Sequence, residues 1–352
     1  MSARQRQRAP QALEAAAIAV VASLPRPVKR MIAGAPIERD GLTLDLDMQL
    51  VVRFAERSPR APLPTVTPVQ ARDELRRSTA LVSGRPRDDV AVREAELAGG
   101  AGPLRARVYE PLEGRLPGAG VLYLHGGGWV VGDLDTHEVP CRALAASSGA
   151  TVVSVDYRLG PEDPFPAPVD DAIAAFTDLC ERADDLGLDA GRLAVAGDSA
   201  GGHLAAVTAQ HAARAGGAAP AFQLLIYPAT DLAEKSASRR IFAEGFLLTD
   251  ENIDWYRANF LAAGGDVNDP RVSPLLAPDL AGLAPAMVVT AGFDPLRDEG
   301  ESYARRLSDA GVRTVLRRHA GFVHGFINMA GVSQGAALAL AEMGGVLRAA
   351  LA

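Results

Sequence analysis

The fold and chemistry of this chain are indicated most directly by one stretch, Gly197-Asp198-Ser199-Ala200-Gly201. It follows an apolar run, Arg192–Ala196, that predicts a strand, and it opens a predicted helix over Ser199–Ala215. A Gly-x-Ser-x-Gly sequence between a strand and a helix is typical of a sharp turn that exposes a serine hydroxyl at the edge of a sheet. This stretch alone also permits a glycine-rich turn with an incidental serine.

Two further stretches supply the groups that such a serine needs. A serine hydroxyl is a weak nucleophile, so it requires a base that an acid side chain orients. His324 follows the last predicted strand and is the candidate base, and Asp294 lies just past the predicted strand Ala286–Thr290 and is the candidate acid. Asp298 competes with Asp294, but its position suits the N-terminal cap of a helix that begins near Glu299. The order Ser, Asp, His is that of serine hydrolases built on an α/β sheet.

A glycine run, His125-Gly126-Gly127-Gly128, follows the predicted strand Gly120–Leu124. Glycines there allow bare backbone amides to approach a reacting carbonyl, and together with the amide of Ala200 they predict an oxyanion hole. The second and third glycines, Gly127 and Gly128, are the first candidates, and Gly126 is the third. A phosphate-binding loop is the rival interpretation, and it fails because no Gly-Lys-Ser/Thr follows.

The neighbours of these motifs are expected to play supporting roles. We expect His125 to brace the glycine loop and Asp198 to hydrogen-bond nearby backbone. Trp129 is expected to line the acyl pocket, although an aromatic residue beside a glycine turn is often plain packing. The charged runs Asp40–Asp47 and Arg72–Arg77 are interpreted as solvated helix faces. The sequence contains neither His-Glu-x-x-His nor Cys-x-x-Cys, so it carries no zinc signature.

Alternating strand and helix patterns predict an α/β fold with an eight-stranded, mostly parallel sheet and helices on both faces. The middle strands are continuous apolar runs, as expected of parallel strands covered on both sides. The first two should form an antiparallel hairpin that turns at Gly99-Gly100-Ala101-Gly102. The expected strands are Val90–Leu97, Leu104–Tyr109, Gly120–Leu124, Thr151–Val155, Arg192–Ala196, Phe222–Tyr227, Ala286–Thr290 and Arg313–His319. The expected helices are Thr136–Ser148, Ala167–Arg182, Ser199–Ala215, Glu299–Ala310 and one from about Ser333.

Two regions fall outside this alternation and are expected to form a helical cap over the site. Residues 1–85 are the N-terminal cap segment, with helices expected over Ala12–Val21, Leu44–Arg57 and Pro68–Ser83. Residues 86–352 form the catalytic domain. A cap insertion at about 231–283 separates two of its strands by far more than a simple crossover, and Thr249 should cap a helix within it.

Composition narrows the class of protein further. The 352 residues can hold one large domain or two ordinary ones, and 48% hydrophobic content supplies a core. A net charge of −7 argues against nucleic acid as a partner. Two cysteines are too few for a disulfide framework, so we expect a cytoplasmic protein.

The N-terminal residues allow an alternative prediction, in which the protein is secreted. Three arginines precede an apolar run, Ala15–Leu24, which resembles a secretory signal. We favour an amphipathic surface helix, because Glu14 lies at the edge of the run and Pro25 ends it; secretion is the minority interpretation. No run approaches the roughly 20 apolar residues of a membrane span.

These motifs together resemble the bacterial hormone-sensitive-lipase family of carboxylesterases, in the subgroup with Asp before the nucleophile. The similarity spans about Val90 to the C-terminus, and Gly160 departs from the alanine common in the family. The resemblance implies an α/β-hydrolase fold with a helical cap, hydrolysis of short- to medium-chain esters without metal or organic cofactor, and homodimers in some members. The matching stretches are His125-Gly126-Gly127-Gly128-Trp129 with Gly132, Asp156-Tyr157-Arg158-Leu159 with Pro161-Glu162, Gly197-Asp198-Ser199-Ala200-Gly201-Gly202, Ser273-Pro274-Leu275, Asp294-Pro295-Leu296-Arg297-Asp298-Glu299-Gly300 and His324-Gly325-Phe326.

The predicted function is therefore carboxylester hydrolysis through an acyl-enzyme on Ser199, with His324 as base and Asp294 as its orienting acid. A long-chain lipase, a lactonase or an amidase would carry the same motifs, because specificity depends on pocket shape. A non-catalytic ligand-binding protein is the alternative from another class. Plant gibberellin receptors resemble this family and lack the triad histidine, whereas this chain retains it.

Overall fold

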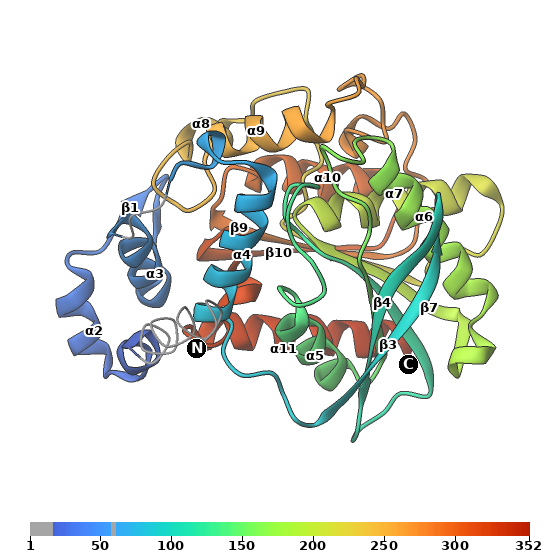
Figure 1. The fold of residues 1–352 in the computed structure, drawn as a ribbon, viewed down its shortest axis with the longest axis horizontal. Coiled ribbons are helices and arrows are strands. Elements are labelled where there is room, and N and C mark those ends of the chain that lie inside the picture. The colour runs from blue at the N-terminus through green and yellow to red at the C-terminus, as the bar shows by residue number, and fades with distance from the viewer. Residues whose placement is uncertain (1–16, 58–60) are drawn as a thin grey trace, which may run out of the picture.

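The computed structural model describes residues 17–57 and 61–352, and an eight-stranded sheet runs through its centre (Figure 1). The strand order is β10-β9-β8-β7-β5-β6-β4-β3. The strands from β10 to β6 pair in parallel, and β4 and β3 complete the sheet as antiparallel neighbours. The predicted eight-stranded, mostly parallel sheet is thus confirmed. Its strands are β3 (Val90–Gly99), β4 (Gly102–Pro111), β5 (Gly118–Leu124), β6 (Thr151–Val155), β7 (Leu188–Asp198), β8 (Phe222–Ile226), β9 (Ala286–Phe293) and β10 (Thr314–Val323).

One strand end differs from the sequence prediction in a way that matters for the site. The β3–β4 hairpin turns where expected, with Gly99 paired to Gly102. However, β10 continues past His319 to Val323 through a shift in its pairing with β9. A bulge of this kind re-aims the chain at the end of a strand. The apolar pattern stops before the bulge, so the sequence-based prediction ended this strand too early.

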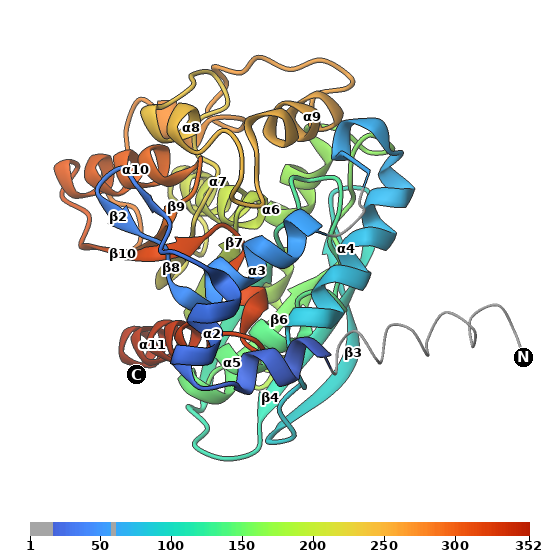
Figure 2. The same ribbon diagram turned by 90° about the vertical axis from the view of Figure 1, so that its left-hand side faces the viewer.

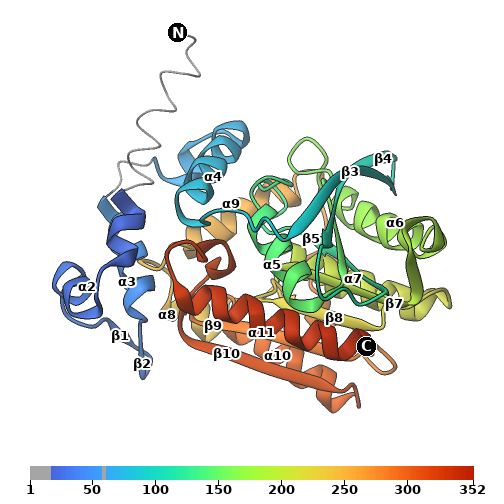
Figure 3. The same cartoon turned by 90° about the horizontal axis from the view of Figure 1, so that it is seen from below.

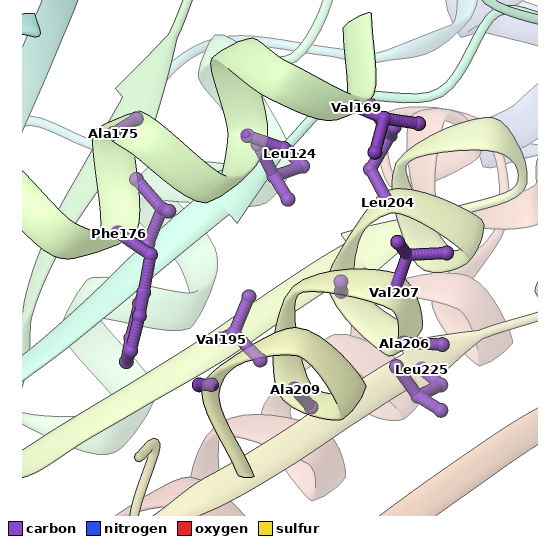
Figure 4. Close-up of a cluster of buried hydrophobic side chains, with 14 of the residues drawn as sticks. Leu124, Val169, Ala175, Phe176, Val195, Leu204, Ala206, Val207, Ala209 and Leu225 are labelled. Atoms are coloured by element: carbon purple, nitrogen blue, oxygen red, sulfur yellow. The ribbon is translucent and has the colours of Figure 1, made fainter. Parts of the chain in front are cut away.

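Helices cover both faces of the sheet. One face carries α6 (Ala167–Glu181), α7 (Ala200–Ala215) and α10 (Arg297–Asp309), and the other carries α5 (Glu138–Ser148) and α11 (Gln334–Leu351). Figure 3 shows α5 and α11 side by side. Successive residues of a strand point to opposite faces, so the apolar run of β7 supplies both layers. Val195 packs with Leu204 and Leu225 on the α7 face (Figure 4), whereas Ala194 and Ala196 face the α11 layer.

The connections around β5 and β7 create the crevice that holds the site. The crossover after β5 runs through α5 on one face, and the crossover after β7 runs through α7 on the opposite face. The loops that follow two such neighbouring strands separate and leave a crevice at the carboxyl edge of the sheet, where α/β proteins bind ligands. Both the glycine loop and the serine turn begin at this point.

The N-terminal part contains more structure than the sequence indicated. Residues 17–23 are helical, and the remainder of the helix predicted over Ala12–Val21 lies outside the described residues. Pro25 and Pro27 end that helix but also begin another, α2 (Arg26–Ala33), because proline is well tolerated at the start of a helix. The run Asp40–Asp47 was predicted to be a solvated helix face, but most of it is not helical. It contains the turn and the second strand of a small hairpin, formed by β1 (Glu38–Arg39) and β2 (Leu42–Thr43), and the helix α3 (Leu46–Arg57) begins only after it.

The cap is formed where the two expected regions meet. From the N-terminal region α4 (Pro68–Val82) and the turn η1 (Leu63–Thr65) pack beside α9 (Asp250–Phe260), over Val130 and Val131 of the glycine loop (Figure 2). Thr249 caps α9 as predicted, through a bond from the amide of Asn252. The other helices of these regions lie farther from the crevice. The helix α3 follows Asp45, whose amide donates to the carbonyl of Gly321 in β10, and α8 (Ala237–Ile241) contacts α10.

The remaining elements are short or peripheral turns: η2 (Asp184–Leu186), η3 (Pro274–Leu276) and η4 (Phe326–Met329). Among the helices of residues 17–57 and 61–352, none combines the length and the apolar character that crossing a membrane requires.

Candidate active site

Ser199 occupies the sharp turn between β7 and α7 that the sequence predicts. Its φ of +55° lies in the left-handed region that side chains rarely adopt. A hydrogen bond to the neighbouring strand stabilises the turn: the amide of Ser199 donates to the carbonyl of Ile226, at the end of β8, at 2.8 Å. A serine held in this strained geometry presents its hydroxyl away from the sheet and toward the crevice.

A neighbouring glycine makes the turn possible by allowing close contact between backbones. A Cβ atom on Gly201 would lie 1.8 Å from the carbonyl oxygen of Leu124, at the end of β5. No side-chain movement relieves a clash with backbone, so only glycine fits there. The serine turn is therefore pressed directly against the strand that carries the glycine loop.

His324 and Asp294 converge on this serine from two other loops. The Nε2 atom of His324 lies 2.9 Å from Ser199 Oγ, and its Nδ1 atom lies 2.8 Å from Asp294 Oδ2. Asp294 is fully buried, and its other oxygen accepts from the amide of Leu296 at 2.8 Å. The carboxylate orients the ring with Nδ1 protonated, which leaves Nε2 free to accept the proton of Ser199. The three residues predicted from sequence are thus brought together in one hydrogen-bonded chain.

Asp298 does not have the role that the sequence suggested for it. The helix α10 begins at Arg297, with Leu296 in the capping position, so Asp298 lies inside the first turn. Its carboxylate accepts from the amide of Ser238 at 2.7 Å and so fastens the inserted segment to α10. The capping prediction is wrong because the helix begins two residues before the expected position.

The glycine loop adopts a conformation that supports an oxyanion hole. Gly127, Gly128 and Trp129 have φ values of +126°, +58° and +60°, so three consecutive residues turn the loop back on itself. Among the described residues, none accepts a hydrogen bond from the amides of Gly127, Gly128 or Ala200. Free amides beside a nucleophile are what a developing oxyanion needs.

Gly126 is a correction to the prediction. Its amide already donates to Asp198 Oδ1 at 2.9 Å, so this N–H points at the carboxylate and is not a free donor. The bond ties the glycine loop to the residue next to the nucleophile. His125 braces the same loop, as expected: its ring stacks on Tyr157 at 4.3 Å, and Nδ1 donates to the Gly126 carbonyl at 2.9 Å.

Trp129 lies at the cavity wall but is mainly a packing residue. Its ring stacks on Phe260 of α9 at 4.3 Å, and Nε1 donates to His203 Nδ1 at 3.1 Å. His203 in turn donates from Nε2 to the carbonyl of Arg271 at 3.0 Å. Burial lowers the pKa of His203 to about 4, so this histidine is a neutral structural link. One face of Trp129 borders the cavity that contains Ser199.

That cavity has a volume of about 170 Å³, and the two parts of the cap roof it. Leu75 of α4 and Tyr256 of α9 line it, and Tyr256 lies against the glycine loop: a Cβ atom on Gly128 would lie 2.2 Å from the Tyr256 ring. The sequence analysis did not single out either of these cap residues, because their role depends on contacts with residues far away in the sequence. The apolar spacing of the cap helices was the one available signal.

Glu299 is a second residue that sequence reasoning missed, although it lies in the motif around Asp294. The residue is 3% exposed and borders the cavity. One oxygen accepts from the amides of Thr230 and Asp231 at 2.7 and 3.2 Å, at the start of the inserted segment. Burial raises the pKa of Glu299 to about 8 despite these bonds, so the side chain is largely protonated at neutral pH.

Across residues 17–57 and 61–352, no group of three or more His, Cys, Asp or Glu side chains is arranged to hold a metal ion.

A sequence profile of a family described as alpha/beta hydrolase fold matches residues 121–328, which include the glycine loop, the serine turn and the histidine loop. The chain belongs to this family. Its resemblance to hormone-sensitive-lipase-like carboxylesterases is confirmed by two ester-hydrolase relatives that are 42% and 46% identical and cover 95% and 66% of this chain.

Two curated relatives and one solved structure illustrate the similarity. The hydrolase is 42% identical over 341 residues to the carboxylic ester hydrolase LipN of Mycobacterium tuberculosis, covering 95% of this chain and 90% of LipN. It is 38% identical over 299 residues to an ethyl acetate hydrolase of Pseudomonas putida, covering 83% of this chain and 94% of that one. An ester-hydrolase from the metagenome of Lake Arreo superposes with a TM-score of 0.84 at 43% identity, over 87% of this chain and 98% of its own.

Proposed function

We propose that this carboxylic ester hydrolase cleaves short- to medium-chain acyl esters through an acyl-enzyme on Ser199. One observation carries the proposal: the unbroken hydrogen-bonded chain from Asp294 through His324 to Ser199, with links of 2.8 and 2.9 Å. Such a chain is the requirement for activating a hydroxyl at neutral pH.

The reaction follows from this geometry in two halves. His324 Nε2 takes the Ser199 proton as Oγ attacks the ester carbonyl, and the same proton is then given to the departing alcohol oxygen. A water molecule next attacks the acyl-enzyme, with His324 again accepting the proton, and the acid leaves. Asp294 stabilises the imidazolium that forms in each half. No step requires a metal or an organic cofactor.

The amides of Gly127, Gly128 and Ala200 are proposed to bind the oxyanion of both tetrahedral intermediates. Their lack of partners within the described structure supports this role. One such donor is worth about 2.7–4 kcal/mol of transition-state stabilisation in a measured case. Trp129 is proposed to form part of the acyl-pocket wall.

The size and position of the cavity favour small acyl groups. Pockets that enclose drug-sized ligands measure about 300–1,000 Å³, whereas this cavity measures about 170 Å³. We therefore rank a long-chain lipase below an esterase, and the ethyl acetate hydrolase among the relatives agrees with that ranking. We propose that the cap segments, 1–85 and 231–283, set the acyl preference of the catalytic domain, 86–352. A lactonase or amidase on the same scaffold remains an outcome of the test below.

Location and assembly are also proposals. The two cysteines, Cys141 and Cys180, are both free, which agrees with a cytoplasmic protein. The family resemblance suggests a homodimer, and the edge strand β10 exposes Val315 and Leu316, which could join a second copy. Light scattering of the purified protein would test the dimer.

The test combines an acyl-chain series with a nucleophile variant. p-Nitrophenyl esters from acetate to palmitate should give the highest kcat/KM at short to medium chains, with a steep fall for long chains. Ser199→Ala should lower kcat roughly a million-fold, by comparison with a subtilisin triad. Near-full activity in that variant would overturn the assignment. Maximal activity on palmitate, on a lactone or on an anilide would replace the substrate class instead.

A further inference from the structure

A second imidazole–carboxylate pair lies beside the nucleophile, outside the proposed triad. His137 Nε2 lies 3.3 Å from Asp198 Oδ1, and the two side chains are 3% and 4% exposed. Both residues border the cavity that contains Ser199. His137 stands just before α5, but its side chain makes no capping bond to that helix. The helix therefore does not explain why a histidine is buried here.

The hydrogen bonds of the preceding residue determine where the protons of His137 lie. The Thr136 hydroxyl donates its one hydrogen to the Asp133 carbonyl at 2.9 Å and accepts from the Asp133 amide at 2.9 Å. His137 Nδ1 lies 3.0 Å from the same hydroxyl oxygen, so the hydrogen in that contact belongs to the ring. The other ring nitrogen faces Asp198, an acceptor. A neutral imidazole has one N–H, so two such contacts require the doubly protonated ring.

Asn328 supplies a second indication that Nε2 of His137 carries a hydrogen. Its amide Nδ2 lies 3.5 Å from His137 Nε2, while its Oδ1 is buried and has no partner among the described residues. Rotating the amide by half a turn would bring Oδ1 to His137 and satisfy it, since the two orientations occupy the same space. That arrangement again needs a hydrogen on Nε2.

The groups around His137 are compatible with one positive charge and one negative charge. From the glycine loop, the ring of His125 lies 5.4 Å away, and burial followed by the charge of His137 lowers the pKa of His125 to about 4. From β5, the ring of Tyr123 lies 6.3 Å away. The remaining titratable groups that act on this cluster are Asp133, Cys141 of α5 and Tyr227 after β8. Burial would raise the pKa of Asp198, but His137, Tyr123 and the Gly126 amide outweigh it and lower the pKa.

Asp198 joins the three loops of the site through these contacts. Its Oδ1 atom accepts from the Gly126 amide at 2.9 Å and from the Tyr123 hydroxyl at 2.8 Å. Asp198 itself belongs to the serine turn, Gly126 belongs to the glycine loop, and Asn328 follows His324 on the histidine loop. A carboxylate alone would also place negative charge beside a developing oxyanion and oppose it.

We propose that His137 is a positioning residue: as an imidazolium paired with Asp198, it holds the glycine loop in register with Ser199 and neutralises the carboxylate beside the oxyanion. This inference rests on the proposed oxyanion hole. It assigns the residue before the nucleophile a task that no triad member performs.

Kinetics test the positioning role. His137→Gln and Asp198→Asn should each lower kcat on p-nitrophenyl butyrate about 10- to 100-fold, less than the loss of an oxyanion donor, with KM changed by less than about twofold. The double variant should be no worse than the poorer single variant, because the pair acts as one unit. His211→Gln, an exposed histidine of α7, is the control and should keep full activity. Unchanged kcat in both single variants would overturn the inference.

Nuclear magnetic resonance of ¹⁵N-labelled histidine tests the charge directly and needs no variant that folds poorly. The signals of His137, identified by their loss in His137→Gln or by coupling to Asn328, should show protons on both ring nitrogens between pH 6 and 8. A single N–H at pH 7 in the wild-type protein would reject the inference. Loss of activity in Ser199→Ala would still support the esterase mechanism in that case, so the two failures are distinguishable.

Discussion

The catalytic loops and the cap border the same cavity, but different interactions hold them. Backbone geometry fixes the loops: Ser199 and Trp129 have positive φ values, and Gly201 lies against the backbone of β5. Side-chain ion pairs hold the cap: Arg72 of α4 pairs with Glu162, and the buried Arg239 of α8 pairs with acidic residues of α9. The loops are therefore built into the sheet, whereas the cap is attached to it.

This difference matches what each region has to do. Attack on a carbonyl depends on geometry to within about an ångström, so the groups that perform it belong on rigid elements. Choice of acyl chain depends only on the volume and polarity of a pocket, which side chains can change without moving the nucleophile. Variants in the loops should therefore abolish turnover, and variants in the cap should redirect it.

The largest effect should come from the acid of the triad. Asp294→Asn keeps the shape of the side chain but loses the charge that fixes the His324 tautomer, so kcat should fall roughly 10⁴-fold, as in a chymotrypsin-like triad. Asp298→Asn is the matched control, because its carboxylate contacts Ser238 and not the imidazole. Its kcat should stay within a few-fold of wild type. Equal losses in the two variants, measured on p-nitrophenyl butyrate, would contradict the assignment.

The next effect concerns stability, at Glu299, which joins the two regions. Its folded pKa is about 8 because of burial, above the usual value near 4.5. Between these pH values the unfolded chain is ionised while the folded protein keeps the proton, so the free energy of unfolding falls as pH rises. The decrease in the free energy of unfolding should amount to about 1.4 kcal/mol per pH unit and a few kcal/mol in all, and it should level off above pH 8.

Glu299→Gln removes this pH dependence, because the amide is neutral at every pH. Urea midpoints at pH 5, 6.5 and 8 should therefore fall less steeply for this variant than for the wild-type protein. Glu251→Gln, at an exposed carboxyl of α9, should leave the wild-type slope unchanged. Parallel slopes for Glu299→Gln and wild type would show that the carboxyl is ionised in the fold.

The same difference between the regions explains what could be predicted from sequence. Ser199, Asp294 and His324 follow predicted strands, and the carboxyl ends of parallel strands meet at one edge, so local pattern was enough to bring them together. The oxyanion hole was also predicted from local pattern, because a run of glycines marks a stretch of backbone that can adopt unusual conformations. These features depend on short-range rules that each stretch carries within itself.

Several of the errors concern contacts between distant stretches. Nothing near Gly126 indicates that its amide is taken by Asp198, which lies 72 residues away. The pairing that carries β10 past His319 depends on β9, and the position of Tyr256 over Gly128 depends on how the insertion folds back. Arg72, interpreted as part of a solvated face, bonds to residues 58 to 90 positions later. Local patterns in a single sequence do not indicate which distant segments will contact each other.

A smaller effect should come from the cap residue that touches the glycine loop. Tyr256→Ala enlarges the cavity where the ring lies over Gly128, so longer acyl chains should fit. The ratio of kcat/KM for octanoate to that for butyrate should rise about tenfold, the scale of one or two methylene groups in an apolar pocket. Tyr256→Phe preserves the ring and should keep the wild-type ratio. An unchanged chain-length profile in Tyr256→Ala would place the acyl group elsewhere.

The smallest effect tests how loosely the cap is attached. Arg72 donates to Glu162 and also to the carbonyl oxygens of Val130 and Gly160, at 2.8 and 3.0 Å. An exposed ion pair contributes about 1 kcal/mol or less, so Glu162→Gln should barely change the free energy of unfolding. Arg72→Ala also removes the two charge-assisted bonds to backbone and should cost about 2 kcal/mol.

The kinetic consequence of loosening α4 separates attachment from chemistry. Leu75 on the same helix borders the cavity, so Arg72→Ala should raise KM a few-fold while kcat stays near the wild-type value. Chemical denaturation and steady-state kinetics on the same preparations measure both quantities. A fall in kcat that matches the loss of stability would mean that α4 holds the glycine loop itself in place, through the carbonyl of Val130, and that the cap belongs to the catalytic framework.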